Sequence, residues 1–186
     1  MKRREALKSI GLVTGGVVLI PSCNLWEEKV SIALNNLQIT PRQESLLKEI
    51  VDIIIPEDPE IPGGVSLEVH NFVWIMIDDC EPKEKQDQFI NGLNQFEVKA
   101  KEMKGKKFSK LDGLAKLETI NSLMVKSENE LEVDINPFLQ TTKNYAVRGY
   151  MESEYVMTKI FPYKLVPGTF GLCETIDANT KINPNA

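Results

Sequence analysis

The sequence predicts a mainly α-helical protein: a small domain of about five helices that continues into an extended, loop-rich C-terminal tail. Apolar residues recur three and four positions apart in several separate stretches, which is the period of a helix with one buried face. No stretch alternates between apolar and polar residues for long enough to require a sheet. Beyond about Ile160, prolines and glycines exclude regular structure and predict the tail.

The first helix is predicted to follow Thr40. Thr40 and Gln43 have the spacing of a capping box, and Pro41 stands at the first helical position. Apolar residues then recur at helical spacing, namely Leu46, Leu47, Ile50, Val51 and Ile54. Pro56 ends this helix, and the prolines and glycines of residues 57–64 predict a rigid loop.

Two further helices are expected before residue 105. A second helix from about Ser66 to Asp79 is apolar over most of its surface, which predicts a place near the centre of the core. A third helix is entered at Pro82 and carries one narrow apolar stripe, made of Phe89, Leu93, Phe96, Ala100 and Met103. Its lysine-rich remainder is expected to face water.

The last two helices are predicted from their start signals. Ser109 is expected to cap a fourth helix, with Asp112 near its positive end. Its inner face is predicted to be Leu111, Leu114, Leu117, Ile120 and Met124. An acidic run at residues 128–134 is predicted to be a solvated link to a fifth helix, which Pro137 opens and which runs toward Tyr150.

The N-terminus has the features of an export signal. Arg3 and Arg4 are followed by a run of apolar residues and glycines at residues 10–20, which is typical of a twin-arginine signal. At about 1.5 Å per residue this run is too short to cross a hydrocarbon core of about 30 Å. The residues leading into Cys23 resemble a bacterial lipobox, which predicts that Cys23 becomes the lipidated first residue of the mature protein.

Two alternatives to this interpretation of the N-terminus stay open. Ala6 stands where twin-arginine signals usually carry a bulky apolar residue, so the general secretory route is one alternative. An ordinary cleaved signal, in which Cys23 is incidental, is the other.

The chain is thereby divided into a signal peptide at 1–22, a tether at 23–39 and a single helical domain at 40–186. The tether is predicted because its residues are polar with scattered apolar positions and no steady period. Without residues 1–22, the chain carries 18 basic and 26 acidic residues, a net charge of −8. Such an acidic domain has no electrostatic footprint for nucleic acid.

The sequence contains no motif for a cofactor of its own. It has no glycine-rich dinucleotide motif after a strand, no C-x-x-C-H for attached haem, and no cysteine group for an iron–sulfur cluster. His70 is the only histidine, which argues against a catalytic triad or a zinc site and favours a hydrogen-bonded structural residue. We therefore predict no catalytic, cofactor-binding or metal-binding residue in this chain.

Three pairs of residues have side chains that are capable of chemistry. The carboxylate pairs Asp78/Asp79 and Glu152/Glu154 are predicted to be surface groups or interface contacts. Cys80 and Cys173 form an even pair in an exported protein, so they are either bridged by a disulfide or two buried thiols.

Two segments near the C-terminus resemble a known family. They are Gly149-Tyr150-Met151-Glu152-Ser153-Glu154 and Tyr163-Lys164-Leu165-Val166-Pro167-Gly168-Thr169-Phe170-Gly171-Leu172-Cys173. Together they resemble the closing signature of the gluconate 2-dehydrogenase subunit 3 family. Earlier elements stand in the family's order, namely Ile54-Ile55-Pro56, Pro62-Gly63, Phe89-Ile90-Asn91-Gly92-Leu93 and Phe108. The resemblance therefore covers about Leu46 to Cys173.

The resemblance implies a non-catalytic small subunit of a membrane-associated dehydrogenase. In such complexes the large subunit is an FAD-containing flavoprotein of the glucose–methanol–choline type that oxidises a sugar or sugar acid. A haem-containing cytochrome c subunit often passes the electrons onward. The small subunit supplies the export signal and escorts the folded, FAD-loaded partner, here to the periplasmic side of the envelope with a lipid anchor.

The C-terminal signature is also where a partner interface is expected, because aromatic anchors are enriched in interface cores. The predicted interface residues are Gly149, Tyr150, Glu152, Ser153, Glu154, Tyr163, Pro167, Gly168, Phe170 and Gly171. The alternative is that these residues only close the domain's own core. A free-standing envelope lipoprotein that binds a ligand or a protein partner is the alternative function.

Overall fold

The computed structural model describes residues 29–125 and 133–161. Within these ranges the chain forms helices and connecting loops, and no strand is present, which confirms the mainly α-helical prediction. The predicted signal peptide, the acidic link up to residue 132 and the tail from residue 162 lie outside the described residues.

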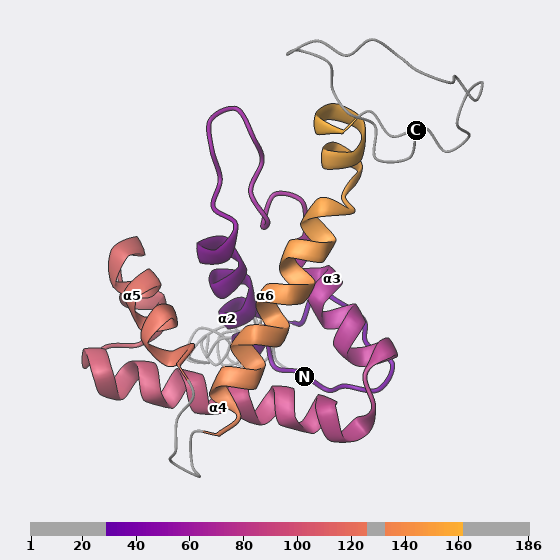
Figure 1. The fold of residues 1–186 in the computed structure, drawn as a ribbon. Helices are drawn as coiled ribbons and strands as arrows, with labels where there is room; N and C mark the ends of the chain where they lie inside the picture. Colours follow the sequence, from indigo (N-terminus) through magenta and orange to yellow (C-terminus); the bar gives the residue numbers. More distant parts are fainter. Residues whose placement is uncertain (1–28, 126–132, 162–186) are drawn as a thin grey trace, which may run out of the picture.

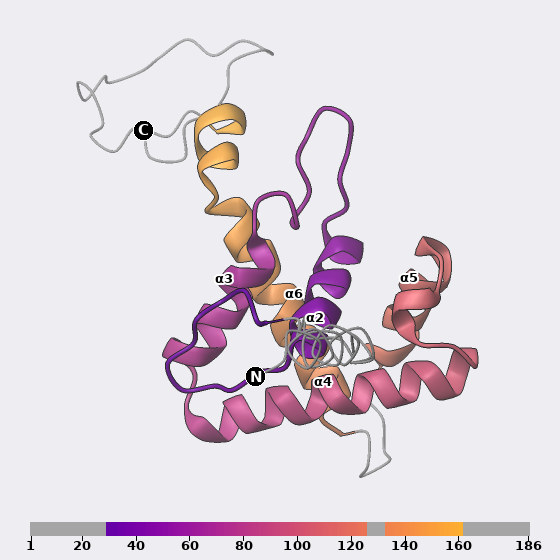
Figure 2. The same cartoon turned by 180° about the vertical axis from the view of Figure 1, so that it is seen from behind.

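The described helices are arranged around one core. They are α2 (Pro41–Ile54), α3 (Val69–Ile75), the π-helix η1 (Met76–Cys80), α4 (Lys83–Lys104), the 3₁₀ turn η2 (Phe108–Lys110), α5 (Gly113–Leu123), α6 (Ile135–Met151) and the π-helix η4 (Val156–Ile160). Figure 1 shows α6 crossing the long α4, with α2 and α3 beside α6; Figure 2 shows the same arrangement from behind. The α4–α6 pair forms the largest helix–helix contact.

The start of α2 confirms the predicted capping box. The Gln43 amide donates to the Thr40 Oγ1 atom at 3.2 Å, and the Thr40 amide donates to the Gln43 side chain at 2.8 Å. Pro41 occupies the first helical position, where a missing N–H costs nothing. One face of the helix then buries Leu46, Leu47, Ile50 and Val51 in the core.

The second helix is shorter than predicted. Residues 64–68 form turns, and α3 begins at Val69 because Glu68 adopts a left-handed conformation with φ of 53° that no α-helix can include. The centre of the helix is buried as expected, with Val73 and Trp74 fully enclosed. The chain then widens into η1, so the apolar run is one α-helical segment followed by a π-helical turn.

The fourth helix corrects two predictions. Its N-cap is Asp112, whose Oδ1 atom accepts from the Ala115 amide at 2.8 Å, whereas Ser109 lies in the preceding 3₁₀ turn. Leu114 and Leu117, predicted to face inward, are 76% and 44% exposed. The helical period is correct, but α5 buries only its C-terminal part, at Thr119, Ile120 and Leu123.

Aromatic rings and one glycine fill the α4–α6 crossing. Phe138 on α6 packs edge-on against Phe89 on α4, with ring centroids 4.9 Å apart. Gly92 on α4 is buried where α6 begins, and a Cβ atom there would lie 2.4 Å from the Asp134 carbonyl oxygen and 2.5 Å from the Phe138 Cβ atom. The crossing therefore depends on glycine at this position.

The segment before α2, predicted as part of the tether, packs on the helical domain from residue 31 onward. Asp78 is only 2% exposed, and its carboxylate accepts from the backbone amides of Asn35, Asn36 and Leu37 at 2.6, 2.9 and 2.7 Å. Leu37 is part of the core. Asp78 is therefore a buried structural residue rather than the surface group or interface contact predicted from sequence.

Replacing Asp78 with asparagine is expected to release this segment. An amide has one acceptor oxygen and no charge, so it cannot reproduce three charge-assisted hydrogen bonds, and the local cost is expected to be about 2 kcal/mol. Hydrogen exchange at residues 35–37 should become about 30-fold faster. Asp79→Asn is the matched control, because Asp79 is exposed and accepts only from the Asn35 side chain. Equal rates of hydrogen exchange at residues 35–37 in the two variants would contradict the structural role of Asp78.

Candidate partner-docking surface

A groove lies at the C-terminal end of α6, where the family signature begins. It has a volume of about 610 Å³ and lies between the start of α3 and the α6–η4 junction. The lining residues are Leu67, Val69, Phe72, Gly149, Glu152, Ser153, Glu154, Tyr155, Thr158 and Lys159. The groove thus has apolar residues on the α3 side and mostly polar residues on the η4 side, a composition that resembles the core and rim of a protein interface.

The groove exists because α6 approaches α3 closely at Gly149. A Cβ atom on Gly149 would lie 2.5 Å from the Cδ1 atom of Phe72, well inside van der Waals contact. Glycine therefore lets the two helices meet at the base of the groove. Any larger residue would push the Phe72 ring or α6 itself away.

Two tyrosines tie the α2–α3 loop to this end of α6. The Tyr150 hydroxyl donates to the Pro62 carbonyl at 3.1 Å, and the Tyr155 hydroxyl donates to the Glu60 carbonyl at 3.2 Å. Burial raises the pKa of Tyr150, with a smaller contribution from Tyr155, so the Tyr150 hydroxyl stays protonated and able to donate. Figure 1 shows the loop extending toward the same end of the molecule as η4.

The turn between α6 and η4 is held by Ser153. Its hydroxyl donates to the Tyr150 carbonyl at 2.7 Å and accepts from the Val156 amide at 3.4 Å. Glu152 pairs with Arg148 one turn earlier at 3.0 Å, across an exposed surface. Glu154 is also exposed, so the rim offers carboxylates that are accessible from solvent.

The predicted interface residues are only partly brought together here. Gly149, Glu152, Ser153 and Glu154 line the groove, whereas Tyr150 packs against the core beneath it, as the alternative interpretation of these residues allows. Tyr163, Pro167, Gly168, Phe170 and Gly171 lie outside the described residues, as do Arg3, Arg4, Cys23 and Cys173. Cys80 is exposed at the end of η1, and its pairing with Cys173 stays a prediction.

Sequence reasoning missed the α3 side of this surface. Leu67, Val69 and Phe72 were predicted as parts of a core helix, and no local pattern distinguishes a residue at a groove from one beneath it. The fit between Gly149 and Phe72 was also missed, because it joins residues 77 positions apart in the chain. A glycine inside an otherwise helical pattern was the only available signal.

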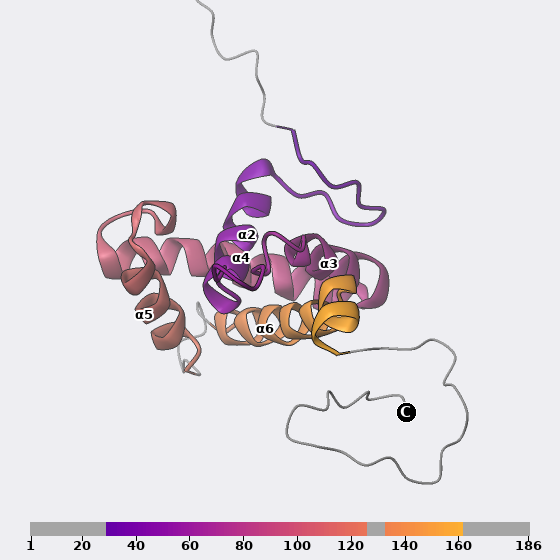
Figure 3. The ribbon, with the colours of Figure 1, turned by 90° about the horizontal axis from the view of Figure 1, so that it is seen from above.

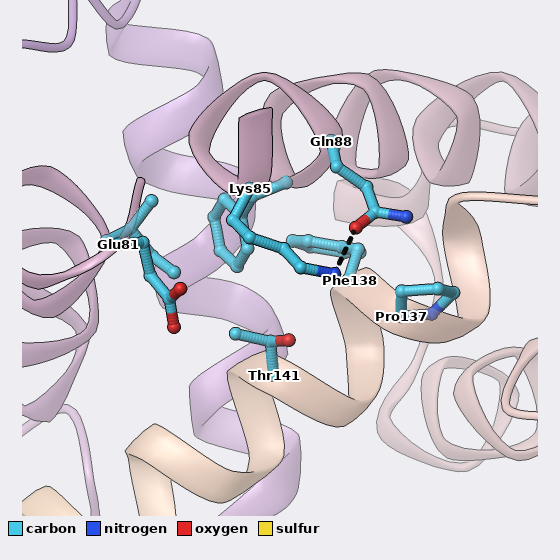
Figure 4. A pocket seen from close by; sticks show the side chains of 8 residues that line it. Glu81, Lys85, Gln88, Pro137, Phe138 and Thr141 are labelled. Carbon is cyan, nitrogen blue, oxygen red and sulfur yellow. Dashed lines mark hydrogen bonds between the residues drawn. The ribbon is translucent and has the colours of Figure 1, made fainter. Parts of the chain in front are cut away.

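A second, smaller cavity of about 150 Å³ lies between α4, α6 and Glu81 (Figure 4). Lys85 donates to Gln88 at 3.1 Å across its rim. Nearby, the Tyr145 hydroxyl donates to Glu81 at 2.5 Å, and this bond to a carboxylate, helped by burial, raises the pKa of Tyr145 to about 12. The Tyr145–Glu81 bond connects α6 to the η1–α4 turn and is structural, whereas Lys85 and Gln88 both lie on α4.

His70 is buried on α3 at 6% exposure, and burial, followed by the charge of Lys48, lowers its pKa. It is thus neutral at pH 7, but its Nδ1 atom has no hydrogen-bond partner, so the prediction of a hydrogen-bonded residue is not met at that atom. In residues 29–125 and 133–161, no group of three His, Cys, Asp or Glu side chains could hold a metal ion. No helix in the described part of the chain is both long and apolar enough to cross a membrane.

Comparison with known proteins gives one match. A family model described as gluconate 2-dehydrogenase subunit 3 matches residues 41–168, more than half of the chain, and includes α2 through η4. No curated protein and no solved structure matched the chain.

Proposed function

Because the chain belongs to the gluconate 2-dehydrogenase subunit 3 family, we propose that it is the small accessory subunit of a membrane-associated, FAD-dependent dehydrogenase that acts on a sugar or sugar acid. The large subunit is a flavoprotein of the glucose–methanol–choline type. A cytochrome c subunit with haem completes the complex where one is present. The chain itself is an escort and stabiliser of the flavoprotein.

The observation that carries this proposal is the family match over the helical domain, together with the groove at the α6–η4 end. The groove coincides with the start of the signature segment, and its apolar base and polar rim suit a protein partner. Several groove positions are held by contacts within the domain, at Gly149, Tyr155 and Ser153. A surface fixed in advance loses little conformational entropy when a partner binds.

The N-terminal segment supports the export part of the proposal. FAD is inserted in the cytoplasm, so the flavoprotein must cross the membrane folded, and a companion with the twin-arginine signal at Arg3 and Arg4 provides the route. Lipidation at Cys23 would then retain the complex on the periplasmic side of the envelope.

Co-expression of the full chain with a flavoprotein of this type tests the proposal. The two are expected to co-purify with flavin absorbance. Thr158→Arg is expected to weaken the complex at least tenfold, about 1.4 kcal/mol, because it places a long charged side chain in the groove while keeping a helix-compatible residue. The measurement is the amount of flavoprotein retained, or a dissociation constant by titration.

Asn144→Arg is the matched control, since it introduces the same residue at an exposed position of α6 that does not line the groove. A folded wild-type chain that retains no such flavoprotein would contradict the accessory-subunit proposal and favour a free-standing envelope lipoprotein. Equal retention by both variants would instead place the docking surface elsewhere.

A further inference from the structure

The corner between α4 and α5, residues 99–116, is positively charged, whereas the protein as a whole is acidic. It contains seven lysines against two acidic residues, Glu102 and Asp112, whereas the whole chain has a net charge of −5. We call this segment the lysine corner. Its lysines are Lys99, Lys101, Lys104, Lys106, Lys107, Lys110 and Lys116.

Four of these lysines are exposed and make no ion pair with any described residue: Lys101, Lys106, Lys107 and Lys110. Lys104 and Lys116, by contrast, pair with Glu118 at 3.0 Å and Glu49 at 2.8 Å. The four exposed lysines therefore form a local surface of uncompensated positive charge.

The lysine corner is held in place by the core beneath it. Phe108, at its centre, is 1% exposed and packs edge-on against Phe96, with centroids 5.1 Å apart. Asp112 caps α5, and the ammonium group of Lys116 lies 5.4 Å from the centre of the Phe108 ring. The exposed lysines thus project from an ordered turn.

Apolar side chains stand beside these charges. Leu114, in the first turn of α5, is 76% exposed, and Met103, near the end of α4, is 42% exposed. Val98, five residues before Met103 on α4, is 60% exposed. Exposed aliphatic residues next to lysines are the composition of segments that lie in the headgroup region of a bilayer.

The N-terminal segment reaches the domain near the lysine corner. Ser31 donates its backbone amide to the Glu44 carboxylate in the first turn of α2 at 3.0 Å. Arg42, in the same turn, lines a shallow hollow with Lys101 and Gly105. Ser31 stands eight positions after Cys23, and a chain of this length can span at most about 28 Å. A lipid on Cys23 would therefore hold this part of the domain close to the bilayer.

From this arrangement we propose that the lysine corner is a membrane-contact site that binds the phosphate groups of anionic phospholipids, with Leu114 and Met103 entering the headgroup region. One part of this inference, the orientation of the complex at the envelope, rests on the proposed function. In Figure 3 the turn between α4 and α5 and the junction between α6 and η4 lie at opposite ends of the molecule. In the proposed orientation the lysine corner therefore faces lipid, while the groove at the α6–η4 junction stays open to the flavoprotein.

The composition favours lipid over a protein partner at this corner. Lysine is depleted in protein interfaces, whereas clustered lysines near a lipid anchor are attracted to anionic membrane surfaces. A basic patch beside a lipid anchor is a common second membrane-binding signal.

Binding of the full chain carrying Cys23→Ala to vesicles tests the proposal without acylation and without a partner. Vesicles of phosphatidylcholine are compared with vesicles that also contain phosphatidylglycerol, at low and high salt. Tighter binding to the anionic vesicles, weakened by salt, is expected. Four substitutions by glutamine, at Lys101, Lys106, Lys107 and Lys110, should lower the preference for anionic over neutral vesicles at least tenfold. Each lysine near a membrane surface raises the affinity for anionic lipid by up to about fivefold.

The matched control replaces Lys48, Lys83, Lys85 and Lys143 with glutamine, the same change of charge at exposed positions outside the corner. The signal peptide is present in every variant, so its own binding cancels in the comparison. The proposal would be overturned if the two variants lost the same amount of their preference for anionic vesicles. It would also be overturned if the binding of the wild-type chain did not depend on phosphatidylglycerol or on salt. It would also be overturned if the corner variant kept its lipid preference but lost the co-expressed flavoprotein. Failure of co-purification with an intact lipid preference would contradict only the proposed function.

Discussion

Replacing Arg3 and Arg4 with lysine is expected to leave the chain, and any flavoprotein that depends on it for export, in the cytoplasm. Lysine keeps the charge but lacks the planar guanidinium fork, so the two residues are not interchangeable where a receptor recognises arginine. The expected effect is a nearly complete loss of export. Fractionation of cells into cytoplasm and envelope measures it for both proteins at once.

The control for this variant is Lys8→Gln, which removes a charge from the same segment and leaves the arginine pair intact. Export of the Arg3→Lys/Arg4→Lys chain at wild-type levels would favour the general secretory route. It would also remove the reason for coupling this chain to a folded, FAD-loaded partner.

Replacing Gly92 with alanine is expected to cost the domain about 2 kcal/mol of unfolding free energy. Alanine favours a helix by about 1 kcal/mol over glycine, but overpacking a filled site costs about 1–3 kcal/mol or more. The close atom here is a backbone carbonyl, that of Asp134, which cannot rotate away, so strain is expected to exceed the gain. Gly92→Leu should unfold the domain outright.

Gly113→Ala is the matched control, because a Cβ atom at Gly113 would meet nothing within 4 Å. It is expected to be neutral or slightly stabilising. Urea unfolding followed by circular dichroism measures both variants, with the midpoint as the readout at constant slope. A Gly92→Ala protein as stable as the wild type would show that α4 and α6 can separate without loss.

Sequence alone predicted the features that depend on neighbouring residues. The capping box of Thr40 and Gln43 lies within four residues, and the apolar stripe of α4 from Phe89 to Ala100 is visible within single turns. Met103, which was predicted to extend this stripe, is 42% exposed. The order of short motifs from Ile54 to Cys173 indicated the family, which the match over residues 41–168 then established. The export interpretation of Arg3, Arg4 and Cys23 also rests on local pattern and stays a prediction.

The tertiary structure decided what depends on residues far apart in the chain. Asp78 is buried because the amides of residues 35–37 reach it from 41 to 43 positions away, and neither segment signals the other in sequence. The groove depends on Gly149 meeting Phe72, and the lysine corner on Phe108 fixing a turn beside the start of α2. Leu114 has the helical spacing of a core residue and is exposed because α5 buries only its other end. Periodicity predicts which residues share a face, and only the packing of whole elements determines whether that face meets the core or the solvent.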